Sequence, residues 1–125
     1  MKETVTKLKS HHLSAILPLA EGQALLPVEQ LLAMLKDSIV QAGLTVVADV
    51  VATFPGQGAS AVAVLEESHV AIHLWPEHKL ATVDIHVCDY SGNNEAKAKH
   101  LAQLIGQHLS GSSSLDKWSQ LTLSV

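Results

Sequence analysis

Hydrophobic residues return along this chain with two different periods, and these periods predict its elements. Between Val28 and Val40 they recur every three or four residues, which is typical of a helix with one buried face. Pro27 suits the first turn of this helix and Gly43 suits its end. Residues 91–94 carry helix-start chemistry, and a second helix is predicted to follow them until residues 110–114 break it. Its apolar face comprises Ala98, Leu101, Leu104, Ile105 and, near its edge, His108.

Segments that are rich in β-branched residues, or that alternate between apolar and polar residues, predict six strands. We expect them at residues 12–19, 44–54, 60–67, 68–75, 80–88 and 121–125, with turns at 55–58 and 77–79. Pro18 restricts the first strand to an end or an edge. The order β-α-β-β-β-β-α-β predicts an α/β (α+β) two-layer sandwich, in which a mostly antiparallel sheet carries both helices on one face.

Two neighbouring strands carry their ionisable side chains on only one face of the predicted sheet. Val70, Ile72 and Leu74 alternate with other residues in the strand at 68–75, and Val83, Ile85 and Val87 do the same in the strand at 80–88. Because side chains alternate across a strand, the remaining positions share the opposite face of the sheet. That face is expected to carry His73, Trp75, Asp84, His86 and Cys88, as a reactive site or a subunit interface.

Composition limits the class of protein. A chain of 125 residues, 47% hydrophobic, predicts one folded domain over residues 1–125. The net charge of -4 provides no basic surface, so no nucleic-acid partner is expected. No apolar run is long enough to cross a membrane, and the first residues do not form a signal peptide. The single cysteine excludes an internal disulfide and fits a reducing, cytoplasmic location.

Spacing alone leaves the chemistry open. Four histidines lie between residues 69 and 86, and imidazole is a common metal ligand. His69 and His73, however, are roughly 13 Å apart on an extended strand, which is too far for two ligands of one ion. We therefore expect no metal. A serine-hydrolase nucleophile is also not indicated, because the chain has no Gly-x-Ser-x-Gly motif.

A longer motif narrows the choice. Residues 67–77 read Glu-Ser-His-Val-Ala-Ile-His-Leu-Trp-Pro-Glu, and residues 83–88 read Val-Asp-Ile-His-Val-Cys. Residues 54–60 read Phe-Pro-Gly-Gln-Gly-Ala-Ser. Together they resemble the short prokaryotic S-adenosylmethionine decarboxylase proenzymes, a pyruvoyl-dependent family. The pattern of that family is Glu-Ser-His, a short strand, Ile-His-Thr-Trp-Pro-Glu, then Asp-Ile/Leu-Phe-Thr-Cys-Gly.

The resemblance implies a chain that cuts itself between Glu67 and Ser68, giving residues 1–67 (β chain) and 68–125 (α chain). The Ser68 hydroxyl attacks the Glu67 carbonyl to form an ester. Loss of the Ser68 α-proton then eliminates the upstream chain, and the residue left behind hydrolyses to a pyruvoyl group. This covalent cofactor forms a Schiff base with the substrate amine and accepts the electrons that decarboxylation leaves behind.

Further roles follow from the same resemblance. His73 is implied as the base that breaks down the ester, with Ser60 assisting the processing. Cys88 is implied as the acid that returns a proton to the substrate. Phe54 and Trp75 are implied to stack on adenine, and Glu77 to hold the ribose hydroxyls. The expected activity is decarboxylation of S-adenosylmethionine for spermidine (polyamine) synthesis, in a homodimer or in cleaved α/β protomers assembled as a dimer.

Several positions depart from the family pattern. Leu74, His86 and Val87 replace Thr, Phe and Thr, and Asp89-Tyr90 follows Cys88 where Gly is usual. Two alternatives therefore stay open. One is a pyruvoyl decarboxylase of another amino acid, arginine or ornithine, whose cationic side chain Asp89 would hold. The other is an inactive, unprocessed paralogue that acts as a binding or regulatory subunit.

Overall fold

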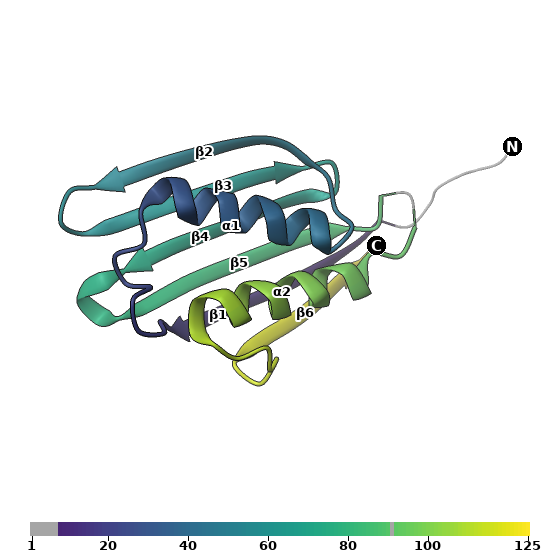
Figure 1. Cartoon of the computed structure of the whole chain (residues 1–125). Coiled ribbons are helices and arrows are strands. Elements are labelled where there is room, and N and C mark those ends of the chain that lie inside the picture. The colour runs from purple at the N-terminus through teal and green to yellow at the C-terminus, as the bar shows by residue number, and fades with distance from the viewer. Residues whose placement is uncertain (1–7, 91) are drawn as a thin grey trace, which may run out of the picture.

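The fold consists of one six-stranded sheet and two helices, as seen in a computed structural model (Figure 1). The structure describes residues 8–90 and 92–125. Ser91, the first residue of the expected helix start, therefore lies outside the described residues. Among the residues described, no helix is long and apolar enough to cross a membrane. In chain order the elements are β1 (Lys9–Pro18), α1 (Val28–Gln41), β2 (Val46–Phe54), β3 (Gly58–Leu65), β4 (Ser68–Trp75), a 3-10 turn (Pro76–His78), β5 (Leu80–Cys88), α2 (Glu95–Ser110) and β6 (Trp118–Ser124).

The strands are arranged in the order β2-β3-β4-β5-β1-β6, and every neighbouring pair is antiparallel. Both helices lie on the same face of this sheet, with α1 over β2 and β3 and α2 over β1 and β5 (Figure 1). The predicted element order and two-layer architecture are confirmed.

The core lies between the helices and the face of the sheet that they cover. Every second residue of β4 and β5 is buried there, and β3 contributes Ala61 and Ala63 at the same level. These small side chains leave room for α1, which buries Leu31, Leu35 and Ile39 completely. Burial of one such side chain contributes roughly 1.5–3 kcal/mol, so this layer supplies much of the driving force for folding.

The ends of four strands differ from the sequence-based expectation: β2 begins at Val46 rather than at residue 44, and β3 spans Gly58–Leu65 rather than residues 60–67. The first strand begins at Lys9 rather than at residue 12, and the last begins at Trp118 rather than at residue 121. Trp118 is only 7% exposed, because its indole packs close to Gly106 of α2. This burial extends β6 toward the loop, which the short alternation at residues 121–125 did not reveal.

One glycine fixes the corner between β2 and β3. Gly58 has φ +107°, a region that side chains with a Cβ rarely adopt. A Cβ here would overlap the carbonyl oxygen of Leu74 and would lie 2.7 Å from Cδ of Pro76. The turn therefore packs directly on the end of β4 and holds Phe54, the last residue of β2, beside that end.

Candidate active site

The sheet face that the helices leave uncovered carries the chemistry. We call it the open face. The register and burial pattern confirm that His73, Trp75, Asp84, His86 and Cys88 lie on it, as the alternation predicted. The same face exposes large apolar side chains, each 45–61% accessible: Ile16, Val50, Val64, Leu121 and Leu123. It thus combines titratable groups with apolar surface.

Ser68 and Cys88 meet at one end of the open face. Ser68 Oγ donates a hydrogen bond to Cys88 Sγ over 3.3 Å. The backbone N–H of Cys88 donates to the carbonyl oxygen of Glu67 over 2.7 Å. The carboxylate of Glu67 is buried, and its Oε1 accepts from the N–H of Thr45 over 3.3 Å. The Glu67–Ser68 peptide is thus held on its carbonyl side by an N–H donor that can polarise it. We call this group the serine end.

The backbone of Ser68 is strained. Its φ of +149° lies in a region that is essentially restricted to glycine, although Ser68 has a Cβ. Such a conformation costs of order 1–3 kcal/mol and persists only where the surrounding structure imposes it. Here the pairing of Ser68 with both Leu65 and Val87 imposes it. A reaction that breaks the Glu67–Ser68 peptide would release this strain.

His86, the middle one of three adjacent imidazoles, lies beside Cys88. The ring of His86 stacks on that of His12, with centroids 4.3 Å apart, and meets the edge of His69 at 5.0 Å. His86 Nε2 lies 3.5 Å from Cys88 Sγ. Burial, followed by the neighbouring His12 and His69, lowers the pKa of His86. In residues 8–90 and 92–125, no three His, Cys, Asp or Glu side chains converge as a metal site requires.

The carboxylate of Asp89 faces away from the open face. It follows the alternation of β5 onto the helix side, where its Oδ1 accepts from buried His11 Nε2 and from the N–H of Asn94, both over 2.9 Å. Asn94 Nδ2 in turn donates to the carbonyl of Cys88 over 2.9 Å. The expectation that Asp89 would hold a cationic substrate beside Cys88 is therefore wrong. This network instead anchors the backbone of Cys88.

The second group of predicted residues lies at the other end of the open face. Ser60 Oγ and His73 Nδ1 are 2.7 Å apart, directly opposite each other on β3 and β4. They line a cavity of about 180 Å³ together with Phe54, Trp75 and Glu77, and Gln57 and Leu74 complete its walls. Trp75 is fixed by a hydrogen bond from its Nε1 to Thr82 Oγ1 over 3.1 Å. We call this group the histidine end.

The two ends do not meet within one chain. Ser68 and His73 lie five residues apart on the extended strand β4, which separates them by roughly 16 Å. A base at that distance cannot reach a proton on Ser68. The structure therefore assembles the predicted residues into two groups rather than one.

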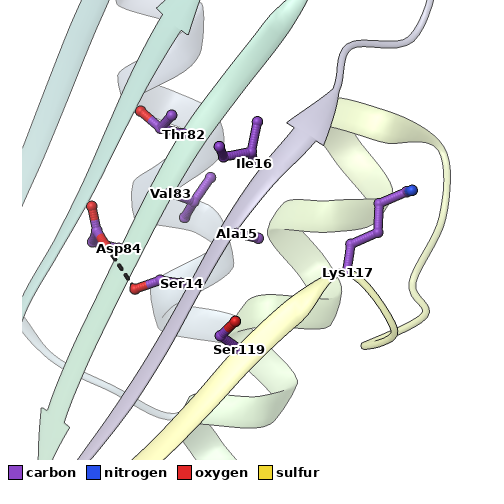
Figure 2. Close-up of a pocket in the computed structure, with 8 residues that line it drawn as sticks. All are labelled: Ser14, Ala15, Ile16, Thr82, Val83, Asp84, Lys117 and Ser119. Atoms are coloured by element: carbon purple, nitrogen blue, oxygen red, sulfur yellow. Dashed lines mark hydrogen bonds between the residues drawn. The ribbon is translucent and has the colours of Figure 1, made fainter.

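A further hollow on the open face holds none of the predicted catalytic residues. It measures about 590 Å³ and is lined by residues of β1, β5 and β6 and by Lys117 (Figure 2). Ser14 Oγ donates to Asp84 Oδ1 across it over 2.7 Å, so this carboxylate already has a partner (Figure 2). The hollow is open to solvent and lies over β5, β1 and β6, on one side of the open face.

Sequence reasoning missed four contributors to the site. His12 and His69 pair with His86 in the register of β1, β5 and β4, so the predicted strands contained the signal once aligned. Asn94 and Thr45 act through single hydrogen bonds to backbone and carboxylate groups of distant residues. No periodicity reveals contacts of this kind.

Comparison with known proteins identifies relatives. A family model described as S-adenosylmethionine decarboxylase matches residues 11–116. The S-adenosylmethionine decarboxylase proenzyme of Aquifex aeolicus (strain VF5) is 43% identical over 61 residues, which are 49% of this chain and 45% of that protein. The proenzyme of Symbiobacterium thermophilum is 32% identical over 83 residues, 66% of this chain and 63% of that protein. This chain thus spans about half of the length of such relatives.

A solved structure is also similar. The crystal structure of the adenosylmethionine decarboxylase from Aquifex aeolicus VF5 superposes with a TM-score of 0.73 at 27% identity. The match covers 95% of this chain and 91% of that one. The likeness therefore extends over nearly all of the fold, including the sheet and both helices.

The network at Asp89 predicts a pH-dependent contribution to stability. Burial alone would raise the pKa of Asp89, but hydrogen bonds from Asn94 and His11 outweigh it and lower the pKa. A carboxyl group with a lowered folded-state pKa stabilises the fold above its unfolded pKa, and this contribution is lost as the pH falls through the folded value. Asp89→Asn should therefore reduce the free energy of unfolding by about 1–2 kcal/mol at neutral pH, and by progressively less below about pH 4.

Urea unfolding at several pH values measures this difference. Asp37→Asn, on the exposed side of α1, is the matched control and should change stability by less than about 0.5 kcal/mol at any pH. An Asp89→Asn penalty that stays constant from neutral pH down to about pH 3 would contradict the assignment.

Proposed function

The chain belongs to the S-adenosylmethionine decarboxylase family, and we propose that it is a self-processing, pyruvoyl-dependent decarboxylase of S-adenosylmethionine. The observation that carries this proposal is the serine end. There a strained Ser68 follows a carbonyl that is polarised by the N–H of Cys88, and the thiol of Cys88 lies 3.3 Å from the Ser68 hydroxyl. The product, decarboxylated S-adenosylmethionine, would supply spermidine (polyamine) synthesis.

Self-cleavage would begin at Ser68. Its Oγ attacks the carbonyl carbon of Glu67, the Glu67–Ser68 C–N bond breaks, and the freed amine takes the hydroxyl proton, leaving an ester. The N–H of Cys88 stabilises the negative charge that develops on the Glu67 oxygen. Removal of the Ser68 α-proton by His73 of a second copy of the chain then expels residues 1–67 with a carboxylate at Glu67. Hydrolysis of the remaining dehydroalanine releases ammonia and leaves the pyruvoyl group on residues 68–125.

The residues around Ser68 fit a pyruvoyl group at this position. Ser68 is its source, and Cys88 Sγ already lies within hydrogen-bonding distance of the position that it would occupy. When formed, the group supplies the electron sink that decarboxylation requires. Cys88 then acts as a positioned acid that gives its proton to the substrate Cα, a contribution of roughly 10²–10⁴-fold.

Substrate recognition would fall to the histidine end. Phe54 and Trp75 are 49% and 42% exposed at the mouth of the 180 Å³ cavity, which suits stacking on a purine. Glu77 is exposed at the same mouth, and its carboxylate can accept hydrogen bonds from two ribose hydroxyls.

The separation of the two ends supports a homodimer. Consider a two-fold axis that lies in the plane of the interface and crosses the middle of β4 at right angles. Rotation about this axis places the serine end of one copy over the histidine end of the other. Two open faces packed in this way would bring His73 and Ser60 of one copy to Ser68 and Cys88 of the other. The exposed Ile16, Val50 and Val64 would be buried at the same time. We therefore propose a face-to-face homodimer of cleaved protomers, each with an α and a β chain, with two composite sites.

The choice of substrate and the location of the protein are each supported by one further argument. The names of the relatives favour S-adenosylmethionine over arginine or ornithine, and Asp89 is already bonded to His11 and Asn94. A working thiol acid must stay reduced, so we propose a cytoplasmic location.

Release of CO₂ from a substrate panel tests the activity. The wild-type chain should decarboxylate S-adenosylmethionine but neither arginine nor ornithine. Ser68→Ala should abolish release from all three, because no pyruvoyl group can form. Ser113→Ala, an exposed loop serine, is the matched control and should retain full activity. Turnover by Ser68→Ala would rule out the cofactor, and release from arginine or ornithine alone would rule out the substrate.

Co-expression of two variants tests the composite site. Neither His73→Ala nor Ser68→Ala should be cut when expressed alone. In a mixed dimer, the intact Ser68 of the His73→Ala chain faces the intact His73 of the Ser68→Ala chain. The His73→Ala chain should therefore be cleaved in the mixture, in up to about half of the copies for random pairing.

Differently tagged chains and denaturing gels make this cleavage visible. If the His73→Ala chain stays intact in proven mixed dimers, His73 acts within its own chain and the face-to-face arrangement is wrong.

A further inference from the structure

Cys88 has a second partner that the proposed reaction does not yet use. On one side its Sγ accepts from Ser68 Oγ over 3.3 Å, and on the other it lies 3.5 Å from His86 Nε2. His86 stands where the resembled family has Phe, which has no ring nitrogen. This chain therefore adds a proton-carrying group next to its thiol.

The position of His86 is imposed by its neighbours. In the register of the sheet, His12 of β1 and His69 of β4 both pair directly with His86. One ring stacks on His86 and the other meets it edge-on, and Ser10 Oγ holds His12 Nε2 over 3.0 Å. These contacts restrict the His86 ring and leave its Nε2 beside the thiol.

We propose that His86 is a positioning residue for Cys88, which holds the thiol against Ser68 and returns its proton after each turnover. The second role rests on the proposed decarboxylation, whereas the first does not.

The proton balance is simple. Loss of CO₂ leaves an electron pair on the substrate Cα, and Cys88 Sγ gives its proton to that carbon. The thiolate then takes a proton from His86 Nε2 while His86 Nδ1 takes one from a hydronium ion of the solvent, so the imidazole passes a proton on and stays neutral. Each turnover thus consumes one solvent proton, and no oxidant or reductant is needed.

The surroundings of His86 suit this role. The titratable groups that face it are His12 from β1, His69 from β4, and Cys88 and Asp84, each two residues away on β5. Strand β6, beyond β1, brings the uncharged Leu121, Leu123 and Ser119 to this face. Burial and the two histidines lower the pKa of His86, so its ring is neutral at neutral pH. A neutral imidazole adds no positive charge that would favour the thiolate over the thiol.

The single cysteine of the chain allows a direct test. The ¹³Cβ chemical shift of labelled Cys88 can be followed by NMR against pH, without any reading of activity. The wild-type curve should show two inflections, a major one for the thiol and a minor one at the pH where His86 titrates, because coupled groups report each other's protonation. His86→Phe, which keeps an aromatic ring and removes Nε2, should lose the minor inflection.

His69→Phe is the matched control, since His69 belongs to the same row but does not contact Cys88. It should keep the minor inflection and move it to higher pH, because a neighbour that lowers the pKa of His86 has gone. The titration is repeated in the Ser68→Ala background, which cannot be cut, so its outcome is independent of the proposed decarboxylation. Identical Cys88 curves for wild type and His86→Phe would overturn the proposal.

Discussion

The antiparallel register between β4 and β5 determines the rest of the site. It pairs Ser68 with Val87 and Trp75 with Leu80, and the short turn at Pro76–His78 sets it. A slip of one residue would exchange the two faces of a strand and move His86 and Cys88 into the core. The apolar Val83, Ile85 and Val87 oppose such a slip, because it would move them out of the core. The packing of apolar residues under the helices thus determines which side chains of β4 and β5 lie on the open face.

The sequence predicted which face of the sheet each site residue lies on, but it did not predict the distances between these residues. Alternation of apolar residues placed His73, Trp75 and Cys88 on the open face, because period two is a property of any strand. The family motif, however, names Ser68 and His73 as parts of one site, and strand geometry separates them by roughly 16 Å. The length of an extended strand, which separates His69 from His73 too far for one metal ion, also separates Ser68 from His73. The strain at Ser68 had no signal in the sequence, since it arises from pairing on both sides.

Two residues that depart from the family pattern, Asp89 and His86, have different roles in the structure. Asp89 continues the alternation onto the helix side and binds His11, so it stabilises the backbone of Cys88 rather than a substrate. His86 stays on the open face beside the thiol. Two neighbouring changes thus act on the same cysteine from opposite sides of the sheet. The open face joins this chemistry to exposed apolar surface, which is the combination that a site completed by a second copy requires.

The most direct measurement is the intact mass of the purified wild-type chain under denaturing conditions. If Ser68 becomes the cofactor, the 13.3 kDa chain separates into two fragments that meet at Glu67 and Ser68. The C-terminal fragment would then be lighter by one ammonia than a fragment that begins with serine. A single uncut chain, or a C-terminal fragment with an unmodified serine at its start, would contradict the assignment of Ser68 as the pyruvoyl precursor.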